Sequence, residues 1–179
     1  AHKPGVLEKA AEIAETLKKA GLRVKLDDSD QSPGWKYAQY EMKGVPLRLE
    51  IGPRDIENGN CVLVRRDNRE KTVVALDNLV ESTQQMLKDF AKAIYEKAKA
   101  NLEGNITPAH NIQEMKDILQ KRVGFVKAMW CGDEHCEEII KNETGMPSRC
   151  IPFEQEHIDD VCPVCGKPAK YMVIFGIAY

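Results

Sequence analysis

Residues 131–136 read CGDEHC and residues 162–165 read CPVC, and these two stretches decide the fold of the last third of the chain. Each stretch places two cysteines close enough for both thiolates to bind one metal ion from a single tight turn of the chain. Gly166 follows the second pair and relieves backbone strain in that turn. Neighbouring amides are able to donate hydrogen bonds to the sulfurs. Four thiolates leave no open coordination position, so the sequence predicts a structural zinc site formed by Cys131, Cys136, Cys162 and Cys165.

Two other uses of these cysteines stay open on the sequence alone. One is a disulfide framework, although nothing indicates secretion and six cysteines in 179 residues are not a dense set. The other is iron, as a rubredoxin-like or cluster site, although such sites usually have tighter paired spacings. Cys61 is expected in a core strand. Cys150 is expected in a core strand as well, with a ligand role as the alternative, and His135 and His157 are expected on the surface.

The segments around the cysteines predict a small α+β domain over residues 106–179. A helix is expected from Asn111 to Gln120, followed by an apolar strand from Val123 to Trp130 that leads directly into Cys131. Val173 to Phe175 are expected in the last strand of the same domain. The metal site is therefore the centre of this domain.

Residues 1–105 predict a separate α/β domain, because their apolar spacing changes repeatedly between the helical and the strand period. Helices between strands favour parallel neighbours, whereas a hairpin adds an antiparallel pair, so we expect a mixed sheet flanked by helices. The expected helices are Val6 to Leu17, Pro33 to Lys43, Asp55 to Glu57 and Leu79 to Ala98, and the expected strands are Leu22 to Leu26, Val45 to Ile51, Cys61 to Val64 and Thr72 to Leu76.

The composition excludes several classes of protein. With 42% hydrophobic and 30% charged residues and no low-complexity tract, the chain is typical of a globular protein. No apolar run approaches the roughly 20 residues that cross a bilayer, and the first residues lack a signal peptide, so we expect a cytoplasmic location and no membrane partner. The net charge of −2 shows no basic bias. Nucleic-acid binding must therefore depend on a local patch of specific residues, and no DNA partner is expected.

Five further motifs are distinctive: PGWK at 33–36, KGVPLR at 43–48, EIGPRD at 50–55, RCIPF at 149–153 and FGIAY at 175–179. Together with the four cysteines they resemble the C-terminal part of prolyl-tRNA synthetase, of the archaeal- and eukaryotic-like type that carries a zinc-binding module after its anticodon-binding domain. The first motifs are also similar to those of threonyl-, histidyl- and glycyl-tRNA synthetases. The zinc module and the terminal tyrosine indicate proline.

The resemblance implies a class II aminoacyl-tRNA synthetase, a ligase of protein biosynthesis that activates proline with ATP and transfers it to proline tRNA. The chain has none of the class's ATP-binding motif residues and no phosphate-binding glycine loop, so ATP and Mg²⁺ are expected only in a separate catalytic domain. In the family this domain usually opens with an apolar strand just before the first helix, and its absence here indicates a fragment. Without the catalytic domain the fragment is expected to be inactive, and the parent enzyme is expected to dimerise through that domain. The alternative is a stand-alone RNA-binding or accessory protein that reuses the same fold.

The resemblance also implies residues that read the anticodon. Proline tRNAs share two anticodon guanines, and single-stranded loops expose both edges of such bases. Arginine can donate two hydrogen bonds to guanine O6 and N7, and a carboxylate can accept from N1 and the 2-amino group. Arg48 and Glu41 match reader positions of the family, and Lys71 resembles a third. The competing interpretation of each is a solvated charge. Further candidates are Lys36 and Arg66 for phosphate contacts, Trp35 for base stacking, and Tyr179 for support of the active site in the full-length enzyme.

Overall fold

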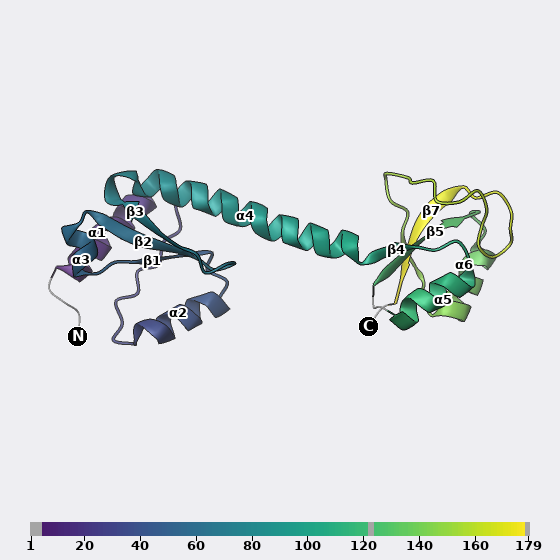
Figure 1. Ribbon diagram of the computed structural model, residues 1–179, viewed down its shortest axis with the longest axis horizontal. Coiled ribbons are helices and arrows are strands. Elements are labelled where there is room, and N and C mark those ends of the chain that lie inside the picture. The colour runs from purple at the N-terminus through teal and green to yellow at the C-terminus, as the bar shows by residue number, and fades with distance from the viewer. Residues whose placement is uncertain (1–4, 122–123, 178–179) are drawn as a thin grey trace. The chain divides into compact units, whose positions relative to one another are not determined.

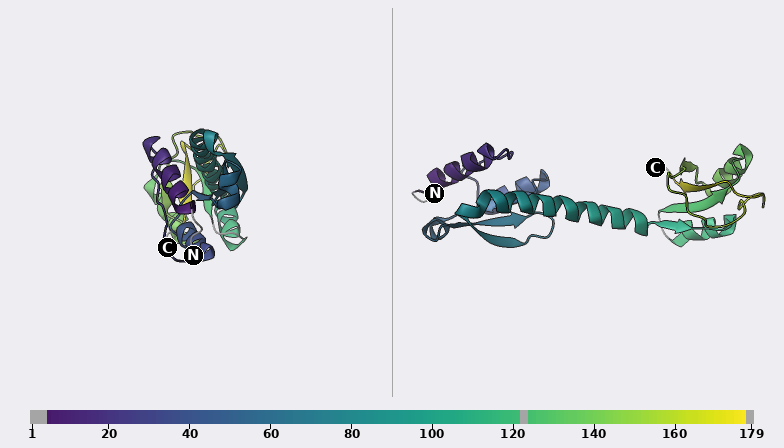
Figure 2. Two further views of the ribbon diagram at one scale, coloured as in Figure 1. Left: turned by 90° about the vertical axis from the view of Figure 1, so that its left-hand side faces the viewer. Right: turned by 90° about the horizontal axis from the view of Figure 1, so that it is seen from above.

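The computed structural model describes residues 5–121 and 124–177, which form two compact units (Figures 1 and 2). The first unit is Ala1–Glu96 and the second is Lys97–Tyr179. The division falls inside the long helix α4 (Leu79–Gly104), whereas the predicted domain boundary between residues 105 and 106 lies just after this helix ends. In the described part of the chain, no helix is both long and apolar enough to cross a membrane.

The first unit is built on a three-stranded sheet with the order β1-β2-β3. Its elements are α1 (Val6–Lys19), α2 (Pro33–Met42), β1 (Leu47–Glu50), α3 (Pro53–Glu57), β2 (Asn60–Arg65), β3 (Lys71–Ala75), a 3₁₀ turn (Leu76–Asn78) and the start of α4. The core lies on one face of the sheet, where Leu63 of β2 packs with Leu17 of α1 and Leu79 of α4. This arrangement confirms the predicted α/β class.

The predicted strand from Leu22 to Leu26 is wrong. These residues have no regular secondary structure and pair with no strand among the described residues. Leu22 and Val24 nevertheless pack on the core of the first unit, as their alternation predicts. Alternation determines which side chains are buried, but a strand also needs a partner backbone. Because Leu22 to Leu26 do not add a parallel strand, the described sheet of the first unit is antiparallel throughout.

Strand register places three charged residues on the sheet face opposite the core of the first unit. Arg48 in β1 is level with Val64 in β2, and Val64 is level with Lys71 in β3. Cross-strand partners share a face, and residues two apart on one strand do so as well. Arg48, Glu50 and Lys71 therefore lie on the same side of the sheet.

The second unit is a four-stranded sheet with the order β4-β5-β7-β6, in which only β4 and β5 are parallel. Its elements are β4 (Ile106–Pro108), α5 (Ile112–Lys121), β5 (Phe125–Trp130), α6 (Glu134–Thr144), β6 (Ser148–Cys150) and β7 (Tyr171–Gly176). Met115 of α5 and Ile140 of α6 pack with Phe175 on one face of the sheet. Met172 lies in a smaller cluster with Ile158. The α+β architecture is confirmed, although neither α6 nor β4 is among the predicted elements.

Candidate metal centre and nucleic-acid interface

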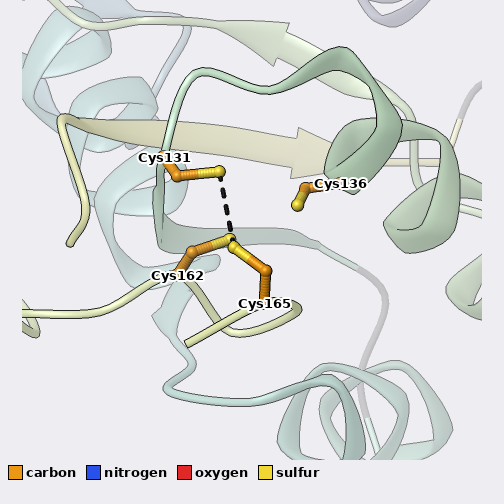
Figure 3. A group of neighbouring side chains, drawn as sticks. All are labelled: Cys131, Cys136, Cys162 and Cys165. Carbon is orange, nitrogen blue, oxygen red and sulfur yellow. Dashed lines mark hydrogen bonds between the residues drawn. The ribbon is translucent and has the colours of Figure 1, made fainter. Parts of the chain in front are cut away.

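Four cysteine sulfurs converge in the second unit (Figure 3). The Sγ atoms of Cys131, Cys136, Cys162 and Cys165 all lie within 4.8 Å of one another, and the Cys131 and Cys165 sulfurs are 3.7 Å apart. Four thiolates around zinc at about 2.3 Å form a tetrahedron with edges of about 3.8 Å. The geometry therefore fits a single tetrahedral metal ion, and the fold brings together the four cysteines that the sequence predicts. No disulfide forms among the cysteines, all of which are described.

The first cysteine pair is positioned by the junction between β5 and α6. Cys131 directly follows β5, and Gly132 then adopts a positive φ of 89° that suits glycine. The Asp133 side chain caps α6 by accepting from the His135 amide at 3.1 Å. This cap fixes Cys136 in the first turn of the helix, where it is only 3% exposed.

The second cysteine pair lies in a tight turn just before β7. The Cys162 amide donates to the Lys167 carbonyl at 2.9 Å, and the Gly166 amide donates back to the Cys162 carbonyl at 3.0 Å. Antiparallel pairing of β5 with β7 sets Trp130 opposite Tyr171 and so holds this turn beside Cys131. Two segments far apart in the sequence thus meet at the end of one strand pair.

Three of the four thiols have pKa values shifted by their surroundings. Burial raises the pKa of the Cys131 and Cys136 thiols. Cys165 is exposed, and the backbone N–H of Lys167 lowers its pKa to about 7. A metal binds the thiolate form, so binding releases protons, and affinity is expected to fall as the pH falls.

The other cysteines and histidines near these motifs lie outside the ligand set. Cys61 is fully buried in β2, which confirms its predicted place in a core strand. Cys150 lies in β6 but is exposed, so the prediction that it is a core residue is wrong. His135 and His157 are exposed, as expected.

Replacing Asp133 by alanine should destabilise the second unit modestly. The α6 cap would lose the acceptor for the His135 amide, and such losses cost about 0.5–2 kcal/mol. Denaturant unfolding of the metal-loaded chain measures the change. Glu138→Ala is the matched control because it removes the same charge from an exposed position of the same helix, where about 0.5 kcal/mol or less is expected. Equal effects of the two variants would contradict the capping role.

The candidate RNA-reading face of the first unit is centred on Arg48. Its Nη1 donates to Glu41 Oε1 at 2.9 Å and its Nε donates to Glu50 Oε1 at 2.8 Å. The Tyr37 ring covers one face of the guanidinium, with 3.8 Å between Cζ and the ring centroid. Burial of the Tyr37 ring, followed by the charge of Glu50, raises the pKa of its hydroxyl. Arg48 is thus held in one orientation by three neighbours.

The network extends from Arg48 to the third predicted reader. The second oxygen of Glu50 lies 3.3 Å from Lys71 Nζ, so one carboxylate joins Arg48 and Lys71. The structure therefore places Glu41, Arg48 and Lys71 in one connected group. The sequence did not predict Tyr37 and Glu50 as members of this group. Their spacing would indicate it, because Tyr37 lies one helical turn before Glu41 and Glu50 lies two residues after Arg48 on the same strand face.

Lys36 lies away from that network and holds a loop. Its Nζ donates to the carbonyls of Asp27 at 3.1 Å and Ser29 at 2.6 Å, and it lies 3.2 Å from the Asp27 carboxylate. Hydrogen bonds from Ser29, together with Lys36, hold the pKa of Asp27 well below its usual range. The phosphate contact of Lys36 stays a prediction, and the loop contacts would compete with it.

The remaining candidates differ in accessibility. Trp35 is 49% exposed and lines an open pocket of about 400 Å³ together with Lys25 and Lys43. Arg66 is exposed, with its guanidinium carbon 5.5 Å from the centre of the Phe90 ring. Tyr179 lies outside the described residues.

Comparisons with known proteins connect these features. A family model described as "Anticodon binding domain" matches residues 2–86, and one described as "Prolyl-tRNA synthetase, C-terminal" matches residues 112–179. With the fold and the cysteine site, they define the anticodon-binding part of a class II aminoacyl-tRNA synthetase. The chain belongs to the prolyl-tRNA synthetase family and corresponds to its C-terminal region.

Individual relatives agree with this assignment. A proline–tRNA ligase of Clostridium botulinum (strain Okra / Type B1) is 54% identical over 178 residues, which are 99% of this chain and 37% of the relative. One from Ruminiclostridium cellulolyticum is 53% identical over the same shares of both chains. The crystal structure of prolyl-tRNA synthetase from Cryptosporidium parvum complexed with L-proline and AMP matches with a TM-score of 0.92 and 38% identity, over 100% of this chain and 38% of that one. The chain thus spans less than two-fifths of the length of these relatives.

Proposed function

We propose that this chain is the tRNA-recognition part of a proline–tRNA ligase, reading the two anticodon guanines with Arg48, Glu41 and Lys71. The observation that carries the proposal is the network that holds a guanidinium, a carboxylate and an ammonium group together on one sheet face. These groups complement guanine, which presents acceptors on one edge and donors on the other.

Guanine binding would exchange partners within this network. In the free chain Arg48 and Glu41 bind each other at 2.9 Å, so neither charge is left without a partner when RNA is absent. An incoming guanine offers O6 and N7 to the arginine and its N1–H and 2-amino group to the carboxylate. A base that lacks this pattern would break the ion pair without replacing it, and this difference is the proposed origin of specificity.

For the cysteine site we propose zinc in a structural role. Four thiolates form a soft donor set that suits zinc or iron, and the 3.7 Å separation of two sulfurs fits a single ion better than a cluster. The four cysteines would occupy all four coordination positions of the ion, which leaves no position for a substrate. The bound ion would hold the β5–α6 junction to the turn before β7.

The parent enzyme is proposed to activate proline with ATP and Mg²⁺ in a separate catalytic domain and to transfer it to proline tRNA in the cytoplasm. The presence of L-proline and AMP in the Cryptosporidium parvum relative supports this proposal. The parent enzyme is also proposed to dimerise through its catalytic domain. The described residues contribute recognition and a metal site to that enzyme.

The test is binding of the purified chain to proline tRNA and to the same tRNA with its two anticodon guanines replaced, in one buffer and with metal content measured in parallel. We expect selective loss of binding when the guanines are changed, and one zinc per chain. Equal binding to both tRNAs would overturn the reading of guanine. Iron or no metal in protein purified without chelator would overturn the zinc assignment.

A further inference from the structure

Glu50 is the residue through which the candidate readers are connected. Its Oε1 accepts from Arg48 Nε at 2.8 Å, and its Oε2 lies 3.3 Å from Lys71 Nζ. The side chain is only 20% exposed, so the carboxylate is held between the two cations rather than free in solvent. Arg48 and Lys71 come from the two outer strands of the sheet, and no other described carboxylate has a recorded ion pair with both.

We propose that Glu50 is a positioning residue that sets the specificity for the two adjacent guanines. The inference depends on the proposed function, because it assigns Glu50 a role only through Arg48 and Lys71. Glu50 need not contact the RNA. Its carboxylate would fix the spacing between two donor groups, so that each meets its own base when the loop binds.

The physical basis is the freedom of long cationic side chains. Arginine and lysine each lose considerable rotamer freedom when they are fixed, and a group that is fixed before binding loses less on binding. Glu50 accepts at Nε and Tyr37 covers one guanidinium face, so together they define both the tilt and the rotation of the Arg48 plane. The recorded bonds of Arg48 in the described chain use Nε and Nη1, and only the Nη1 bond to Glu41 has to exchange.

This role predicts a result that the loss of a negative charge alone does not. Removing a negative charge from a surface that binds RNA should tighten binding to any RNA, because phosphate attraction is independent of sequence. Removing a residue that positions base readers should instead reduce discrimination between the two tRNAs. The discrimination ratio is the affinity for proline tRNA divided by the affinity for the guanine-substituted tRNA, and it separates the two effects because general electrostatic attraction cancels in it.

The experiment measures this ratio for the zinc-loaded 179-residue chain and for Glu50→Gln, Glu50→Asp and Glu70→Gln. We expect Glu50→Gln to lower the ratio about three- to tenfold, as is typical when a contacting charge partner is lost. Glu50→Asp keeps the charge but withdraws the carboxylate by one methylene, so positioning predicts a loss there as well. Glu70→Gln is the matched control, because its carboxylate binds Asn68 rather than a reader, and its ratio should not change.

Combination with Arg48→Lys distinguishes the inference from the function on which it depends. If Glu50 acts through Arg48, Glu50→Gln should have a smaller effect in the Arg48→Lys background than in the wild type. Loss of discrimination in Arg48→Lys but in neither Glu50 variant would overturn only the role of Glu50. Unchanged discrimination in all three variants would overturn the reader assignment itself, and a ratio for Glu50→Gln equal to that for Glu70→Gln would reduce Glu50 to an ordinary surface charge.

Discussion

Replacing Cys136 by serine should release the metal and unfold the second unit while the first unit stays folded. Cys136 is buried beside the other three sulfurs, and serine supplies no thiolate. The free energy of a structural zinc site is largely folding free energy, and loss of a direct ligand should reduce affinity by more than the roughly 10–100-fold that loss of an outer partner costs. Metal content and a calorimetric scan measure the two effects.

The matched control for that variant is Cys150→Ser. Cys150 belongs to the same unit but is exposed and lies outside the four-sulfur group, so zinc content and unfolding should stay as in the wild type. Because the two units have separate cores, the scan of the Cys136 variant should show the transition of the first unit at an unchanged temperature. Full zinc binding by Cys136→Ser would exclude it from the ligand set.

Replacing Arg48 by alanine should weaken binding of proline tRNA by about 1–3 kcal/mol, or about 5- to 150-fold, the loss expected for one bidentate base contact. The change also removes the nearest cation of both Glu41 and Glu50, so Arg48→Lys is the companion variant. Lysine keeps the charge but lacks the planar fork that donates to O6 and N7 together. It should retain general affinity and lose much of the discrimination between proline tRNA and its guanine-substituted form.

Arg23→Ala controls for the loss of charge alone. Arg23 is an exposed arginine of the first unit in the segment between α1 and α2, outside the reader network. Its removal should weaken binding of both tRNAs to the same small extent. The assignment of Arg48 fails if its alanine variant changes the two affinities in the same proportion as Arg23→Ala does.

The sequence predicted the convergence of the four cysteines because ligand spacing is a local property. Two close cysteine pairs restrict the chemistry almost regardless of the intervening chain. The helix between the pairs was missed, even though Asp133 before it and Gly145 after it are ordinary cap residues. The apolar residues of this helix include Ile140, which is fully buried in the core.

Strand pairing in the sheet of the first unit was harder to predict, because it is not a local property. Alternating residues placed the core correctly, and the expected hairpin between β2 and β3 formed. Pairing, however, depends on which backbones meet, and no pattern within Leu22 to Leu26 says whether a neighbour is present. The contact between Glu50 and Lys71 was not predicted for a related reason, because the two residues are 21 positions apart and are brought close only by the register of three strands.

The attachment of α2 has a consequence for how ionic strength acts on this protein. None of the ten residues of α2 is fully buried, and its recorded polar ties include Lys36 to the Asp27 loop and Glu41 to Arg48. Charges about 3 Å apart are screened little at 0.1 M salt, where the Debye length is about 10 Å, and appreciably only near 1 M, where it is about 3 Å. Raising the salt concentration toward 1 M should therefore loosen the helix that carries Glu41 as well as weaken phosphate attraction. Selectivity for the anticodon should then decline along with affinity, whereas a reader on a rigidly buried helix would lose affinity alone.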